Sequence, residues 1–191
     1  MLLEADRLPS AVALSILSIE ESGKVPVLRQ MATADGEKEV RDIWKAYRSH
    51  IKKNVLWIFG ELVAKGGRTL DELRGVVDPN SDHPDILDQL KQLSLYTDCF
   101  TKATWTSPQE LDLTTLAAYL VKMAQILAKA RTIVPEEVQL WRQHLWPVRN
   151  APLAEQKRAV EAWYGEMRIR GLSDAGAEDV EQFLAANQPQ A

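Results

Sequence analysis

The chain has 191 residues, of which 46% are hydrophobic and 26% charged, and its formal net charge is −4. This composition is typical of a globular protein, and the length suits one domain that buries most of its apolar surface. The acidic balance excludes a global attraction to nucleic acid or to an anionic membrane, so a nucleic-acid substrate would require a local basic patch.

Cysteine usage and the N-terminal sequence favour a reducing cytoplasm. The single cysteine, Cys99, excludes an intrachain disulfide and a cysteine-based zinc site. The first residues lack the basic-then-apolar pattern of a signal peptide. The longest apolar stretch, Ala11 to Ile19, is too short to span a bilayer. We therefore expect a cytoplasmic protein that does not associate with membranes.

Apolar residues recur at helical spacing along almost the whole chain, which predicts an all-α protein without a sheet. The first predicted helix runs from about Pro9 to Arg29, and Pro26 should kink it near Ser22. The second runs from about residue 37 to residue 64 and ends before two glycines. Its apolar stripe consists of Trp44, Tyr47, Ile51, Val55, Ile58 and Leu62.

Shorter helices are predicted downstream. A capping box from Thr69 to Glu72 begins one, another covers about residues 85–93, and residues 95–100 look extended. Pro108, Pro135 and Pro152 each begin a helix, and Gly171 ends the third of them. Short connections favour an antiparallel bundle. We interpret residues 1–191 as one domain, with a last short helix at 174–186 and a frayed tail at 188–191.

Two glutamates at the end of the first apolar stretch form one candidate site. Glu20 lies one turn beyond Ile16, so its carboxylate should face packed helices, and Lys24 lies within ion-pair reach of both Glu20 and Glu21. Gly23 would let another backbone approach closely. These residues leave two interpretations open, a functional polar site or a helix-end ion pair without a function.

A basic segment of the second predicted helix forms another candidate. Arg48 borders the apolar stripe, so a buried guanidinium there would need one of the two glutamates as its partner. His50 lies roughly 200° further round a regular helix and shares a face with Lys53 and Asn54. This ridge could hold a phosphate and supply a proton-transfer group. The alternative is an exposed or capped histidine without a function.

The other polar motifs indicate no metal or cofactor. Residues 78–83 begin like a calcium loop, but His83 stands where glycine is needed and Gln89 where glutamate is needed. His144 lies between two tryptophans and is expected to pack. The sequence contains no glycine-rich phosphate loop, no nucleophile elbow and no histidine pair at zinc spacing.

Three segments, in this order, resemble the AbiV (abortive infection V) family of bacterial proteins, which belongs to the HEPN superfamily of helical bundles. They are AVALSILSIEESGK at 11–24, WKAYRSHIKKN at 44–54 and LYTD at 95–98. The motif region covers residues 1–104, and residues 105–187 supply additional C-terminal helices. The chain begins almost inside the first segment, which implies a shortened first helix.

The resemblance implies an abortive-infection (phage defence) or toxin protein that acts on RNA or on the translation machinery. Many HEPN proteins are metal-independent endoribonucleases that act as dimers, with an arginine and a histidine as the catalytic pair, often beside an antitoxin. The implied partners are a second copy, RNA, and an antitoxin or phage protein. By resemblance, the catalytic candidates are His50, Arg48, Glu20 and Glu21. The substrate-binding candidates are Lys24, Lys53, Tyr96 and Asp98. Asn54 is a further substrate-binding candidate because it lies on the basic ridge beside Lys53.

The spacing of the expected catalytic pair departs from the HEPN ribonucleases. There four to six residues separate the arginine from the histidine, whereas one residue separates Arg48 from His50. Either the active site differs or RNA cleavage is absent. The competing interpretation is a non-enzymatic interaction module in which the same residues form a buried network that fixes helix register. A catalytic cluster would open to a cleft, and a structural one would be closed and fully paired.

Overall fold

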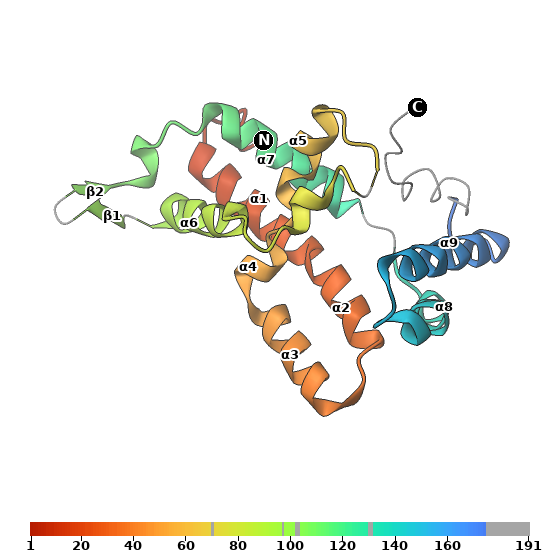
Figure 1. Ribbon diagram of the computed structural model, residues 1–191. Coiled ribbons are helices and arrows are strands. Elements are labelled where there is room, and N and C mark those ends of the chain that lie inside the picture. The colour runs from red at the N-terminus through yellow and green to blue at the C-terminus, as the bar shows by residue number, and fades with distance from the viewer. Residues whose placement is uncertain (70, 97, 102–103, 130–131, 175–191) are drawn as a thin grey trace, which may run out of the picture. The chain divides into compact units, whose positions relative to one another are not determined.

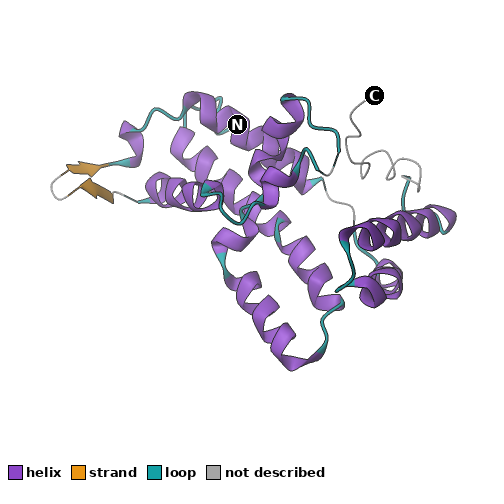
Figure 2. Cartoon of the chain, in the orientation of Figure 1, coloured by secondary structure: helices purple, strands orange, loops and turns teal. Residues whose placement is uncertain are grey.

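The computed structural model in Figure 1 describes residues 1–69, 71–96, 98–101, 104–129 and 132–174. For residues 98–101 and 104–106 it describes the backbone alone. The last predicted helix and the predicted frayed tail lie, apart from Asp174, outside these residues. Contacts divide the chain into two compact units. Unit 1 comprises residues 1–25, 46–60 and 76–130, and unit 2 comprises 26–45, 61–75 and 131–191. Helices dominate the described chain, which confirms the all-α class (Figure 2).

Unit 1 is built around α1 (Leu8–Ser22), which packs against α6 (His83–Leu95) and α7 (Thr114–Ala128) (Figure 1). The short α4 (His50–Lys53) contacts α1 and α6. Burial of the apolar faces of these helices gives this unit its stability. The buried residues are Val12, Ile16 and Ile19 of α1, Leu87 of α6, and Leu113, Ala117, Leu120, Met123 and Ala124 in and before α7.

Unit 2 has its own core between α8 (Pro135–Leu145) and α9 (Leu153–Ile169), which confirms the two helices predicted to begin at Pro135 and Pro152. Trp163 of α9 is buried against Trp141 of α8, with ring centroids 4.9 Å apart. The Arg29 guanidinium lies 5.2 Å from the Trp163 ring centroid and bonds to the buried Glu137 at 2.7 Å. The contacts with Glu137 and with the faces of Trp141 and Trp163 attach the Arg29 side chain to this core.

The first predicted helix is interrupted where the sequence indicated. α1 ends at Ser22, and α2 (Lys24–Ala32) begins directly after Gly23. The capping box at Thr69 is also confirmed, because the Thr69 amide donates to Glu72 Oε2 at 2.9 Å. The turn that follows is the 3-10 helix η2 (Arg74–Val77). Helix α7 begins later than expected, since Pro108 begins the separate turn η3 (Pro108–Glu110).

The continuous helix predicted for residues 37–64 is wrong. The structure has α3 (Gly36–Arg48), α4, the 3-10 turn η1 (Leu56–Ile58) and α5 (Phe59–Ala64). Ser49 breaks the helix because its backbone is extended, with ψ 126°, and its side chain accepts from the Lys52 amide. A serine in that conformation caps a new helix rather than continuing the old one. No residue of α3 is buried, so the predicted apolar stripe is not a core face there.

The prediction that no sheet occurs is wrong in one place. β1 (Asp98–Thr101) and β2 (Thr104–Thr106) form an antiparallel pair, with Cys99 opposite Trp105 (Figure 2). The extended conformation expected after residue 95 is thus present from Asp98 onward. The sequence here is rich in threonine and aromatic residues, which favour strands, but the run is too short to show alternation. The last 3-10 turn, η4 (Trp146–Val148), follows α8.

Candidate functional site

A buried carboxylate near the end of α1 is the centre of the candidate site. The Glu20 side chain is 3% exposed, and its two oxygens have different partners. Oε1 accepts from the Lys91 ammonium at 2.5 Å, and Oε2 lies 2.8 Å from His50 Nδ1. Glu20 therefore faces packed helices, as its spacing from Ile16 predicts.

The backbone of α4 reaches this site because Gly23 leaves room for it. A Cβ placed on Gly23 would lie 2.1 Å from the carbonyl oxygen of Lys53. That distance is far below any normal contact, so the close approach expected of Gly23 is confirmed. It brings the segment from His50 to Asn54 against the end of α1, within reach of Glu20.

Overpacking usually costs about 1–3 kcal/mol. We expect Gly23→Ala to lower the free energy of unfolding by about 3 kcal/mol or more, because the group that it meets is the Lys53 carbonyl, which cannot move aside by changing rotamer. Urea denaturation of the purified protein measures it. The matched control is Gly75→Ala, where a Cβ would come no nearer than 3.6 Å to another atom. Equal stability of both variants would contradict the close approach.

The break at Ser49 determines where His50 points. In a continuous helix, His50 would lie on a different face from Arg48, on the basic ridge. The new helix that begins after Ser49 instead directs His50 Nδ1 at Glu20. The imidazole side chain is still 54% exposed, so one side of the ring is held by a buried carboxylate while much of the ring is open.

Sequence reasoning missed two residues of α6. The Lys91 side chain is 4% exposed, and its ammonium bonds to Glu20 and, at 2.7 Å, to Asp88. The signal was present, because Lys91 follows the buried Leu87 by one turn and so lies on the buried face of α6. Burial alone would lower the pKa of Lys91, but hydrogen bonds with Asp88 and Glu20 outweigh it and raise that pKa above its ordinary value.

Arg48 does not meet either glutamate, so the predicted ion pair is wrong. The guanidinium is exposed and has no ion pair with any described residue. Glu20 is taken by Lys91 and His50, and Glu21 is paired with Lys24 at 2.5 Å near the surface. Arg48 lies at the end of α3, just before the break, where the apolar stripe is not buried and no desolvation forces a pairing.

The other predicted site residues are dispersed. Lys53 is buried at the end of α4, and Asn54 next to it is fully buried, with no hydrogen-bond partner for its side-chain amide among the described residues. Tyr96 is exposed at the end of α6. Asp98 lies in β1, and its side chain is outside what the structure describes. Contacts between side chains thus join two pairs of the predicted set, Glu21 with Lys24 near the surface and Glu20 with His50. Lys91 and Asp88 extend the second pair.

The cluster has three groups of the kind that bind metals. One ligand atom each from Glu20, His50 and Asp88 lies within 4.8 Å of the others. The Lys91 ammonium already bonds to both carboxylates, so a cation of the protein itself occupies their shared space. The arrangement suits proton transfer instead. An imidazole whose second nitrogen is oriented by a carboxylate is the usual form of a general base.

The described residues define an all-α helical protein in which a buried glutamate faces a half-exposed histidine. A model of the HEPN group described as AbiV matches residues 1–129. The chain belongs to the AbiV family of HEPN proteins and is thus of the abortive-infection type. The match continues past the motif region to the end of α7. No curated protein and no solved structure matches the chain.

Proposed function

We propose that the protein is a metal-independent endoribonuclease of the abortive-infection type, with His50 as its proton-transfer group. The observation that carries the proposal is the half-exposed imidazole bonded through Nδ1 to the buried Glu20. A neutral imidazole near physiological pH can take a proton from a ribose hydroxyl, and the protonated ring can return one to a leaving oxygen.

RNA suits such a site because it contains its own nucleophile, the 2′-hydroxyl. Removal of that proton by His50 leads to attack on the adjacent phosphorus, and the 5′-oxygen leaves with a proton. The phosphate gains negative charge during this step. Arg48 is exposed, lies two residues before His50 in the sequence, and is the cation that we assign to that charge. Lys53, the other predicted candidate, is buried and is not assigned this role.

The test of this function is incubation of the purified protein with total cellular RNA in a chelator, beside single-stranded DNA of the same length. We expect RNA cleavage, no DNA cleavage, and products with 2′,3′-cyclic phosphate ends. Intact RNA, combined with growth arrest when the protein is expressed, would favour an interaction module that acts through a protein partner. An antitoxin or phage protein would be that partner.

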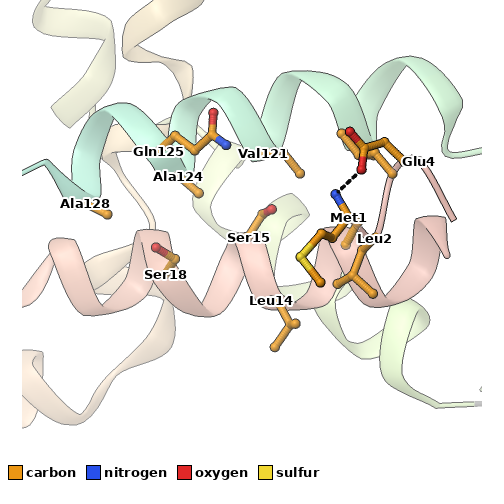
Figure 3. Close-up of a pocket in the computed structure, with 12 residues that line it drawn as sticks. Met1, Leu2, Glu4, Leu14, Ser15, Ser18, Val121, Ala124, Gln125 and Ala128 are labelled. Carbon is orange, nitrogen blue, oxygen red and sulfur yellow. Dashed lines mark ion pairs between the residues drawn. The ribbon is translucent and has the colours of Figure 1, made fainter. Parts of the chain in front are cut away.

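We also propose that the protein is a homodimer that pairs through the groove between α1 and α7. Figure 3 shows small side chains of both helices along this groove, whose volume is about 590 Å³. Leu14 beside it is 57% exposed, and Glu4 is bonded to the Met1 ammonium at 2.8 Å. The small residues would let a helix of a second copy approach closely. Pairing would also bury the exposed Leu14 side chain, which is favourable because it removes apolar surface from water. The helix residues are Ala11, Leu14, Ser15 and Ser18 of α1, and Val121, Ala124, Gln125 and Ala128 of α7.

Light scattering at micromolar concentration should give twice the chain mass of 21.5 kDa. Leu14→Glu should give the monomer mass, because it would bury a carboxylate in the pairing face. The matched control is Leu28→Glu on α2, which is also exposed but lies outside the groove and should stay dimeric. A monomeric wild type would overturn the dimer, and a dimeric Leu14→Glu variant would place it on another face.

A further inference from the structure

The hydrogen-bond roles around Glu20 can be assigned from chemistry alone. An ammonium only donates, and an ionised carboxylate only accepts. Lys91 donates to Oε1, and the partner of Oε2 is His50 Nδ1. Nδ1 must therefore carry a hydrogen. In the neutral ring the other nitrogen, Nε2, is then the acceptor.

The other two histidines of the chain are assigned in the same way, with the opposite result. His83 Nδ1 accepts from the Trp57 indole at 3.0 Å, and its Nε2 lies 3.2 Å from the Val76 carbonyl oxygen. His144 Nε2 lies 2.7 Å from a Glu166 oxygen. In both neutral rings the hydrogen belongs on Nε2. His50 is the histidine of this chain whose hydrogen belongs on Nδ1.

We propose that Glu20 determines which nitrogen of His50 accepts a proton, and that Lys91, held by Asp88, is the positioning residue that keeps the Glu20 carboxylate against Nδ1. Either carboxylate oxygen would accept from Nδ1, so Lys91 acts by fixing the place of the Glu20 side chain. Lys91 and Glu20 are both almost completely buried, so water competes little with this contact. Asp88 holds the same ammonium from the other side at 2.7 Å. The role in catalysis rests on the proposed endoribonuclease function, whereas the tautomer of His50 does not.

The test is a long-range ¹H–¹⁵N spectrum of the three imidazoles in the labelled full chain at about pH 8.5, well above the reference imidazole pKa of about 6.5. In the wild type we expect the unprotonated nitrogen to be Nε2 in His50 and Nδ1 in His83 and His144. A wild-type His50 with its hydrogen on Nε2 would overturn the proposal.

The substitution Glu20→Gln makes the role of Lys91 measurable. Because Lys91 only donates, the glutamine oxygen must face it, and the amide NH₂ then faces His50 Nδ1. Nδ1 becomes the acceptor, so the His50 hydrogen should move to Nε2, while His83 stays unchanged. In the double variant Glu20→Gln/Lys91→Met the amide can turn, and hydrogen on Nδ1 should return in part. If Glu20→Gln leaves the hydrogen on Nδ1, Lys91 does not orient residue 20.

Activity provides a second, separate measurement. A wrongly placed imidazole hydrogen costs up to about 10⁴-fold in rate, so Glu20→Gln should lose RNA cleavage on that order. If the wild type does not cleave RNA, the proposed function fails but the tautomers still decide the role of Lys91. If the double variant does not fold, the reversal in Glu20→Gln alone decides it. Reversal of the tautomer with full RNA cleavage would remove this positioning from the mechanism.

Discussion

His50→Ala should lower RNA cleavage by about 10²–10⁴-fold, the usual cost of losing a proton-transfer group. The fold should survive, because the side chain is half exposed and Glu20 keeps its stronger partner, Lys91. The loss of one hydrogen bond costs about 1 kcal/mol. Initial cleavage rates on a defined RNA, with unfolding curves of the same preparations, measure both effects.

The control for His50→Ala is His144→Ala. His144 also bonds to a glutamate through one ring nitrogen, at 2.7 Å from Glu166, but it lies on α8 in unit 2, partly buried against α9. The same substitution there should leave the cleavage rate unchanged. Equal rates for the wild type and a folded His50→Ala variant would remove His50 from the mechanism. Equal losses in both variants would indicate an effect of stability rather than chemistry.

Lys91→Ala should lower the free energy of unfolding by about 3–5 kcal/mol, the usual cost of removing one partner of a buried ion pair. The variant leaves the Glu20 carboxylate buried, with His50 as its remaining partner. Urea denaturation at neutral pH measures the difference. Lys45→Ala is the matched control, because Lys45 is exposed and bonds to Asp42 one turn away. Such surface pairs contribute about 0–1 kcal/mol, so similar losses in both variants would contradict the buried pair.

The pH dependence of that difference follows from the raised pKa of Lys91. A group whose pKa is higher in the folded than in the unfolded state stabilises the fold fully below the unfolded value, about 10.4 for lysine. The stabilisation is lost as pH rises through the folded value. The stability of the wild type should therefore stay above that of Lys91→Ala through the neutral range and approach it above about pH 10.4.

Much of the fold could be predicted because local residues determine it. The helix beginnings at Pro135 and Pro152, the Thr69–Glu72 capping box and the interruption near Ser22 all depend on residues within one turn of each other. The inward direction of Glu20 follows from its spacing to Ile16 in the same helix. The short hairpin at residues 98–106 was not predicted, because seven described residues are too few to show a period of two.

The candidate site was predicted in part, and its limits have a physical cause. The all-α class, the family, the buried carboxylate at Glu20 and the close approach at Gly23 could all be predicted, since each depends on local spacing or on an ordered motif. Which cation meets that carboxylate depends on how the helices pack. Arg48, Lys24 and Lys91 all lie on predicted helices, and although Lys91 follows Leu87 by one turn, that spacing does not tell which carboxylate its helix face meets.

Once the helices pack, the cost of burying a charge determines which of these three cations must pair with Glu20. Lys91 lies on the face of α6 that α1 covers, so it must pair with Glu20, whereas Arg48 stays in water and needs no partner. The break at Ser49 likewise has a consequence that only the packed helices show. It allows the backbone of the segment after Ser49 to lie against Gly23, and it turns His50 toward Glu20.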